Sequence, residues 1–181
     1  MTTIENIPAV LLELRASSIH AGGVGVFTVR DVALGEKVAD GVPEEDFQEI
    51  VSWEEFSHLD KELQRKIMTF CVGNADGFIP PPGFDFNKLS IEWYLNHSCE
   101  GNCGFDEQGD FVAIHNIKKG AELSYDYALI ESNPNFSMKC SCGSKKCRQI
   151  VTGNDWKDED FLTMNRDHMH PMLRRLLPIP A

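Results

Sequence analysis

The chain has 181 residues, a formal net charge of −11, and 42% hydrophobic and 9% aromatic residues. This length and composition describe one folded domain, with room for a small appended module, and exclude a disordered chain. The acidity disfavours direct nucleic-acid binding, because a phosphate-binding surface needs a basic footprint. It suits a cationic partner such as a Lys/Arg-rich peptide, although acidity that only keeps the chain soluble is the simpler explanation.

No stretch of the sequence reaches the roughly 18 apolar residues that a membrane span requires, so we expect no membrane contact. The first apolar run, residues 9–12, is stopped by Glu13 and lacks a basic flank, which predicts no secretory leader. We therefore expect an intracellular protein. No basic localisation run is present, so the sequence does not distinguish cytoplasm from nucleus. Six cysteines in such a chain favour metal or redox chemistry over disulfides.

The predicted elements begin with short strands and glycine turns over residues 10–40. Ser52 and Glu55 then form a capping box, and apolar residues recur at helical spacing through Phe70. This pattern predicts one long helix or two short ones, with a face turned to the core. Further on, we expect a loop over residues 73–87, a hairpin over 105–114, and a helix over 160–176 that ends before Pro178. The fold is expected to be mostly β with a helical insert (α+β).

Three thiols lie within eight residues, in the pattern Cys140-x-Cys142-x4-Cys147. Three such thiols cannot all pair with one another, and a fourth ligand would complete a tetrahedral zinc site. Cys99 and Cys103 are the candidates, with Cys71 a more distant one. A site of four thiolates is closed, so zinc would be structural and not the catalyst. The alternative is a set of buried or reactive cysteines without a metal.

Three further patterns are ambiguous by themselves. The triplet Gly23-Val24-Gly25 lacks the third glycine of a dinucleotide fingerprint and is more typical of a turn. Asn96-His97 is typical of a satisfied structural pair. Tyr125 and Tyr127 would point to opposite faces of a regular strand and can meet at one site only if the chain leaves strand geometry there. Otherwise they are core residues.

Taken in order, four motifs match those of one known family. Residues 23–27 (GVGVF) match its GxG turn before Val-Phe, and residues 93–102 (WYLNHSCEGN) match its RFINHSCxPN segment. Residues 120–127 (GAELSYDY) match GEELTYDY, and residues 140–149 (CSCGSKKCRQ) match CxCGxxxCRG. Over residues 10–40 and 90–156, the chain therefore resembles a SET-domain protein lysine methyltransferase followed by a post-SET zinc motif.

The resemblance implies a SET-type β-clip with a pseudoknot, in which the NHSC segment and the YDY strand are threaded together. It implies a SET domain over residues 8–139 with a variable insert over 41–90. A post-SET zinc motif over 140–156 and a C-terminal helical tail over 157–181 would follow. The implied zinc ligands are Cys99, Cys140, Cys142 and Cys147.

The resemblance also implies that S-adenosylmethionine donates a methyl group to a substrate lysine by in-line displacement, which depends on positioning. The lysine would enter a narrow channel from the side opposite the cofactor. Tyr127 would orient the amine, and Tyr125 occupies the family's product-size switch, which favours mono- or dimethylation. The implied cofactor-binding residues are Gly23, Val24, Gly25, Tyr94, Asn96, His97 and Trp156, the last stacking on adenine. The substrate would be a lysine-containing protein or peptide, with a histone tail as the default class.

The sequence departs from the family pattern at four positions. Trp93 stands where the family has an arginine that helps hold the cofactor, and Gly101 replaces a proline, which we expect to loosen the turn into Asn102. Ala121 and Gln149 replace a glutamate and a glycine at positions that look peripheral. Two other hypotheses stay open beside an active enzyme: a non-catalytic SET-like module that binds peptides, and a zinc-stabilised scaffold whose tyrosines are core residues.

Overall fold

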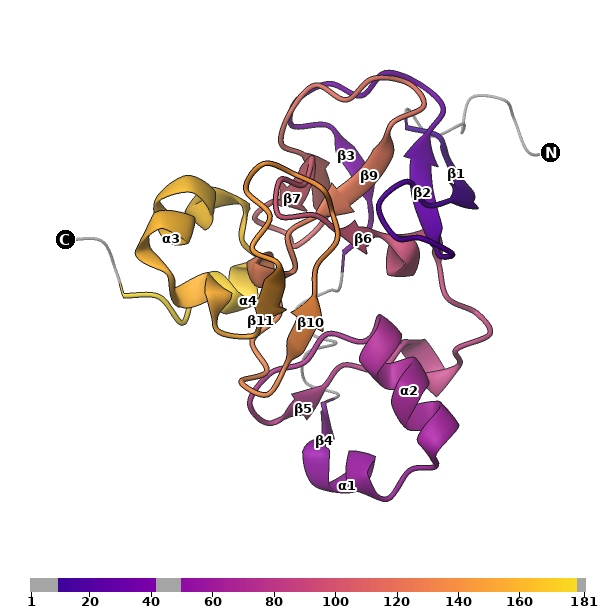
Figure 1. Cartoon of the computed structure of the whole chain (residues 1–181), viewed down its shortest axis with the longest axis vertical. Coiled ribbons are helices and arrows are strands. Elements are labelled where there is room, and N and C mark those ends of the chain that lie inside the picture. The colour runs from indigo at the N-terminus through magenta and orange to yellow at the C-terminus, as the bar shows by residue number, and fades with distance from the viewer. Residues whose placement is uncertain (1–9, 42–49, 179–181) are drawn as a thin grey trace.

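The computed structural model of the protein describes residues 10–41 and 50–178, and its main feature is a seven-stranded sheet in the order β1-β2-β9-β7-β8-β3, with β6 paired to β9 (Figure 1). Its strands are β1 (Leu12–Ala16), β2 (Val24–Thr28), β3 (Lys37–Ala39), β6 (Asn96–His97), β7 (Cys103–Phe105), β8 (Phe111–Ala113) and β9 (Glu122–Tyr125). The predicted short strands near the N-terminus and the predicted hairpin, formed by β7 and β8, are confirmed.

Strand β9 brings segments far apart in the sequence together. It pairs antiparallel with β2 and parallel with β6, where Asn96 lies opposite Ser124 and His97 opposite Tyr125. It also pairs parallel with β7 at Cys103. The expected side-by-side placement of the NHSC and YDY segments is therefore present.

The insert between β3 and β6 contains β4 (Val51–Ser52), α1 (Trp53–Ser57), α2 (Lys61–Phe70) and β5 (Gly77–Phe78). The Ser52–Glu55 capping box is confirmed, and the helical pattern forms two helices because Asp60 caps a new one. Ile67 is the buried residue of α2, so its core-facing side is narrower than we expected. The predicted loop contains β5 and a short 3-10 helix, Pro82–Phe84. Part of the predicted insert, residues 42–49, lies outside the described residues.

The C-terminal segment differs from the single predicted helix. After β10 (Ser137–Lys139) and β11 (Ile150–Thr152) come a 3-10 turn (Asp155–Lys157), α3 (Glu159–Asn165), a second 3-10 turn (Arg166–His168) and α4 (Pro171–Arg174). The prediction of one helix over 160–176 is wrong because Pro171 disfavours helical geometry in the residue before it, and His170 is extended (φ −56°, ψ 137°). Residues 179–181 of the predicted tail lie outside the described residues.

The hydrophobic core includes side chains from the sheet and from the C-terminal segment. Val26 and Leu123 from the sheet and Met169 and Leu173 from the C-terminal segment are fully buried in one cluster. His170 lies edge-on to Phe105 with ring centroids 5.0 Å apart. The residues that we predicted to form a tail therefore complete the core of the SET-like sheet.

Candidate active site and cysteine cluster

Two tyrosines meet at the end of β9. The strand ends at Tyr125, and Asp126 caps a 3-10 helix (Tyr127–Leu129) by accepting from the Ala128 amide. The chain thus leaves strand geometry here, which was the condition for the two tyrosines to meet, and their ring centroids lie 5.0 Å apart. Burial raises the pKa of Tyr127 to about 12 and that of Tyr125 well above 10, so both phenols stay neutral. Tyr127 Oη donates to the Leu95 carbonyl oxygen (3.3 Å).

His97 connects the tyrosines with the cysteines. The Tyr127 amide donates to His97 Nδ1 (3.1 Å), and His97 Nε2 lies 3.2 Å from Cys99 Sγ. Burial lowers the pKa of His97 to about 4. The Asp126 charge opposes this shift, and the Arg148 charge adds a smaller lowering effect. The ring is therefore neutral, accepts at Nδ1, and carries its proton at Nε2, toward the sulfur.

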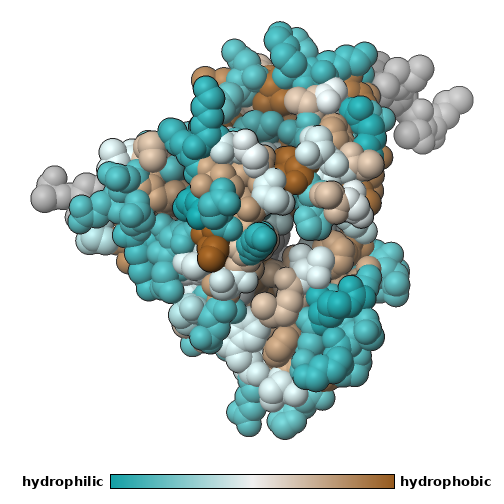
Figure 2. Space-filling view, in the orientation of Figure 1, coloured by the Kyte–Doolittle hydropathy of each residue, from teal (hydrophilic) through white to brown (hydrophobic). Residues whose placement is uncertain are grey.

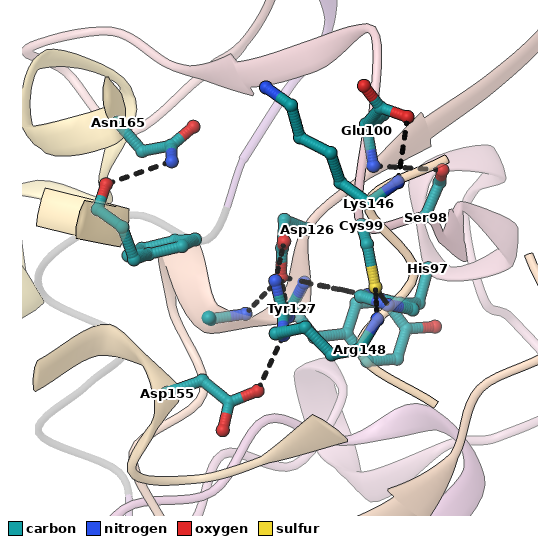
Figure 3. A network of polar contacts seen from close by, with 12 residues as sticks. His97, Ser98, Cys99, Glu100, Asp126, Tyr127, Lys146, Arg148, Asp155 and Asn165 are labelled. Atoms are coloured by element: carbon teal, nitrogen blue, oxygen red, sulfur yellow. Dashed lines mark hydrogen bonds and ion pairs between the residues drawn. The ribbon is translucent and has the colours of Figure 1, made fainter. Parts of the chain in front are cut away.

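Arg148 holds the two halves of this site together, as Figure 3 shows. Its Nη1 and Nη2 donate to the two carboxylate oxygens of Asp126 (2.6 and 2.7 Å), and its Nε donates to Asp155 (2.8 Å). Its amide lies 3.4 Å from Cys99 Sγ. A bidentate pair between buried or half-buried groups fixes geometry strongly. Arg148 therefore fastens the segment after the cysteines to the residue between the two tyrosines.

The predicted zinc ligands form one cluster. The Sγ atoms of Cys99, Cys140, Cys142 and Cys147 all lie within 4.8 Å of one another. Cys99 and Cys140 sulfurs are 3.8 Å apart, close to the roughly 3.8 Å spacing expected around a tetrahedral zinc with Zn–S bonds of about 2.3 Å. The donor set fits zinc. Of the other candidates, Cys103 is buried in β7 and neither it nor Cys71 joins the cluster.

Gly23, Val24 and Gly25 lie beside Asn96 at the start of β2. Asn96 Nδ2 donates to the Val24 carbonyl oxygen (2.8 Å) and to Glu122 Oε1 (3.0 Å). A Cβ at Gly25 would lie 2.1 Å from Glu122 Oε1, and one at Gly23 would lie 2.5 Å from the His20 ring. Packing against the buried Glu122 therefore accounts for Gly25, whereas Gly23 meets an exposed side chain, and any ligand would meet the Val24 side chain, which is 46% exposed.

Glu122 is a site residue that our sequence analysis did not select. Besides Asn96, it accepts from the Ser17 hydroxyl (2.7 Å) and from the amide and hydroxyl of Ser18. Burial alone would raise the pKa of its carboxyl, but these hydrogen bonds outweigh burial and hold the pKa below its usual value. Asp126 and Arg148 were also missed as site residues, although both lie inside matched motifs.

The two tyrosines line a cavity of about 280 Å³ between the sheet and the insert. Six aromatic side chains contribute to its wall: Phe70, Trp93, Phe111, Tyr125, Tyr127 and Phe136. Figure 2 shows hydrophilic residues over the outer sides of α2 and α3 and less polar residues along the middle of this face. All the predicted cofactor-binding residues lie outside this wall: Gly23, Val24, Gly25, Tyr94, Asn96, His97 and Trp156.

Tyr94 and Trp156 are half-buried at two different places. Tyr94 packs edge-on against Phe70, with ring centroids 5.7 Å apart. The Trp156 indole nitrogen donates to the Gly153 carbonyl oxygen (3.0 Å), and the Lys157 ammonium lies over its ring. The structure thus brings Asn96, His97 and the two tyrosines together, while Trp156 follows the cysteine cluster along the chain.

Gly101 does not loosen its turn, contrary to our expectation. It is buried, and a Cβ there would lie 2.6 Å from the Tyr125 Cα. The Asn102 amide donates to the Ser124 carbonyl oxygen (2.9 Å), and the Asn102 side chain bonds to Glu122 and Ser124 of β9. The absence of a side chain therefore permits close contact with β9.

Comparison with known proteins agrees with this architecture. A family model described as "SET domain" matches residues 23–128. Histone-lysine N-methyltransferase ASHH2 of Arabidopsis thaliana is 30% identical over 161 residues, which are 83% of this chain and 9% of that protein. Human histone-lysine N-methyltransferase 2B is 35% identical over 148 residues, which are 75% of this chain and 5% of that protein.

Among solved structures, one of a humanized mutant of the Chaetomium thermophilum Polycomb Repressive Complex 2 is similar to this chain. The alignment covers 70% of this chain and 16% of the chain in that structure, with 24% identity and a TM-score of 0.49.

The chain belongs to the SET domain family. It spans less than a tenth of the length of the two relatives named above. In residues 10–41 and 50–178, no helix combines the length and apolar character needed to cross a bilayer.

Proposed function

We propose that this chain is an S-adenosylmethionine-dependent protein-lysine N-methyltransferase. The observation that carries the proposal is the pair Tyr125 and Tyr127. They lie at the end of β9, where Tyr125 pairs with His97 of β6, and both form part of the wall of an aromatic cavity. Membership of the SET domain family and relatives named histone-lysine N-methyltransferases support the same reaction. A scaffold would not require two neutral phenols at a cavity.

The acceptor amine must lose its proton before it can attack. A lysine with a pKa near 10.4 is less than about 0.1% neutral at pH 7, a handicap of roughly 4–5 kcal/mol. Desolvation by the aromatic side chains of the cavity lowers that pKa, because it disfavours the charged form, whereas an ionised carboxylate in the wall opposes this effect. Tyr127 would orient the amine through its hydroxyl. Tyr125, with its ring 5.1 Å from that of Phe111, would narrow the space beside the amine and favour mono- or dimethylation.

The residues proposed to hold the cofactor come from β6 and the segment before it, from the start of β2 and from the segment after the cysteines. Val24 with its glycine neighbours, the Asn96–His97 backbone, Tyr94 and Trp156 would bind and enclose it. When bound, S-adenosylmethionine supplies the methyl group as an activated sulfonium. Two observations support this placement. The Val24 side chain is exposed, and the Asn96 side chain holds the Val24 backbone through its carbonyl oxygen, next to β9 with Tyr125.

We further propose that the four clustered cysteines bind one structural zinc ion. Four thiolates close the coordination sphere, so the ion would fold the segment over residues 140–156 and take no part in methyl transfer. Arg148 would then join that segment to Asp126 beside the tyrosines.

The proposed substrate is a lysine-containing protein or peptide, with histone tails as the first class to test because both named relatives are histone-lysine N-methyltransferases. The net charge of −11 supports a basic partner and not nucleic acid as a direct ligand. An intracellular location, cytoplasmic or nuclear, and the absence of membrane contact are part of this proposal.

Incubation with methyl-labelled S-adenosylmethionine and core histones or a lysine peptide array, read by mass spectrometry, tests the proposal. The wild-type protein should add one or two methyl groups to lysine. Tyr127→Phe should lower the rate at least about 100-fold, since it removes a positioning hydroxyl, while leaving the melting temperature nearly unchanged. Ser90→Ala is the control, because it removes one hydroxyl group from the same cavity wall at a residue with no proposed role in transfer. Normal transfer by Tyr127→Phe would refute the assignment of Tyr127, and no cofactor binding by the wild-type protein would refute the enzyme.

A further inference from the structure

Glu131 is a buried carboxyl group in the wall of the tyrosine cavity. Its residue is 6% exposed, and it lies four positions after Tyr127, beyond the 3-10 helix. Its charge acts on Tyr125 strongly enough to contribute to the raised pKa of that phenol. Neither the sequence motifs nor the proposed mechanism uses Glu131.

A structural role accounts for part of its bonding. Glu131 Oε2 accepts from the Gly73 amide (2.9 Å) and Oε1 accepts from the Asn133 amide (2.8 Å). The first bond fastens the insert to the segment after β9. The Ser132 amide also acts on this carboxyl group. Because a carboxylate offers about four acceptor positions, the three amides leave capacity for a donor inside the cavity.

The charge of the cavity wall has one sign. Glu131 and Glu92 are its two charged residues, and among the described residues no Lys, Arg or His contributes to the wall. Glu92 is half-buried and accepts a hydrogen bond from Ser90. Aromatic faces and carboxylates without a competing cation favour a positively charged guest.

Three titratable groups that share the cavity wall with Glu131 have raised pKa values and stay neutral near neutral pH. From the insert, burial raises the pKa of Cys71 to about 12. From the sheet and the turn after it, Tyr125 and Tyr127 have raised pKa values, as described above. Burial raises the pKa of Glu131 to about 7, against the opposing effect of its amide hydrogen bonds. Glu92 is the other acidic group at the cavity.

We propose that the ionised carboxylate of Glu131 recognises the ammonium group of the acceptor side chain in this cavity. The identification of the guest as a lysine rests on the proposed function, but recognition of an alkylammonium ion does not. Glu131 thus acts as a specificity-determining residue: it selects a charged amine over a neutral chain of equal length. Binding of that amine should weaken as Glu131 becomes protonated.

The test uses n-butylammonium as a probe and n-butanol as its neutral counterpart, titrated into the full chain and read from the NMR signal of the Trp93 indole N–H. Butylammonium resembles the lysine side chain and stays charged between pH 6 and pH 8. At pH 8 we expect butylammonium to bind at least about 10-fold more tightly than butanol, because a hydrogen bond between charged groups changes the affinity by about this factor or more. At pH 6 its affinity should fall about 10-fold, with a midpoint near pH 7, while butanol affinity stays constant.

Glu131→Gln should reduce the ratio of butylammonium affinity to butanol affinity to nearly one, and the butylammonium affinity should no longer depend on pH. Glu92→Gln is the matched control, because it removes an equal charge from the same cavity and should keep the midpoint. A merely structural Glu131 would weaken both probes equally in Glu131→Gln. If that variant does not fold, the wild-type pH curves decide the question alone.

Equal wild-type affinities for the two probes, or loss of the preference in Glu92→Gln alone, would overturn the inference. If the protein transfers methyl groups but shows no preference for butylammonium, the proposed role of Glu131 is wrong and the proposed enzymatic function stands. Conversely, pH-dependent ammonium binding without methyl transfer supports the cavity and rejects the enzyme.

Discussion

At the scale of single residues, Gln149 occupies a backbone conformation that suits glycine. Its φ is +64°, and its carbonyl oxygen accepts from the Cys140 amide (2.8 Å), so the turn brings β10 and β11 together. A left-handed conformation costs an L-residue about 1–2 kcal/mol. Gln149→Gly should therefore raise the free energy of unfolding by about 0.5–1 kcal/mol, after the greater freedom of glycine in the unfolded chain is subtracted.

Urea denaturation measures this change. Gln149→Ala keeps the Cβ and should give no gain, which separates backbone strain from loss of the exposed amide side chain. A Gln149→Gly protein no more stable than wild type would show that the turn carries no strain. The sequence marked this position only as a departure from a family glycine, because the sign of φ is a property of the folded turn.

Glu131 also makes a prediction about stability. Its pKa is raised from 4.5 to about 7 in the folded protein, so the folded state binds more protons than the unfolded state between these values. The free energy of unfolding should therefore fall as the pH rises from about 4.5 to about 7, by an amount of order 3 kcal/mol from this group. Glu131→Gln should flatten that part of the profile, measured by urea denaturation at a series of pH values. An unchanged slope in the variant would mean that Glu131 ionises normally.

At the scale of elements, short sequence motifs correctly predicted the features that depend on neighbouring residues, such as helix starts and hairpin turns. The Ser52–Glu55 capping box begins α1, and the Gly109 turn joins β7 to β8. The cysteine spacing predicted three members of the cluster, but the fourth needed the family resemblance. The prediction of one helix over 160–176 was wrong, although Pro171 was visible in the sequence, because Pro171 keeps His170 out of helical geometry and so separates α3 from α4.

The contact between the Gly101 loop and β9 yields the prediction for this scale. A Cβ at position 101 would lie 2.6 Å from the Tyr125 Cα and 2.8 Å from the Ser124 carbonyl oxygen, both backbone atoms. The backbone of a paired strand cannot shift far enough to relieve such a clash. Gly101→Ala should therefore lower the free energy of unfolding by about 1–3 kcal/mol. Denaturant unfolding measures the loss.

Gly23→Ala is the control for Gly101→Ala. Its new Cβ would meet the ring of the exposed His20 side chain, which can rotate away, so a smaller loss is expected. Equal losses for the two variants would indicate that the glycines matter through backbone freedom and not through close packing.

At the scale of the whole molecule, the cysteine cluster joins a loop after β6 to the segment between β10 and β11. Arg148 continues that connection, since its guanidinium bonds Asp126 beside the tyrosines and lies over the Phe161 ring of α3. A metal in the cluster would therefore order the cysteine segment and, through Arg148, the contact between that segment and β9. Such long-range bonding is not readable from the order of residues along the chain.

Removal of the metal tests this connection. Chelation should release one zinc ion per chain, measured by atomic emission, and lower the free energy of unfolding by about 3–4 kcal/mol if the ion is present at 100 to 1,000 times its Kd. Because Arg148 then loses its fixed position, limited proteolysis should cut residues 140–156 much faster. Cys147→Ser should reproduce the effect without chelator, whereas Cys71→Ala, outside the cluster, should keep the ion. Unchanged proteolysis after the ion leaves would show that the Arg148–Asp126 pair holds this segment without a metal.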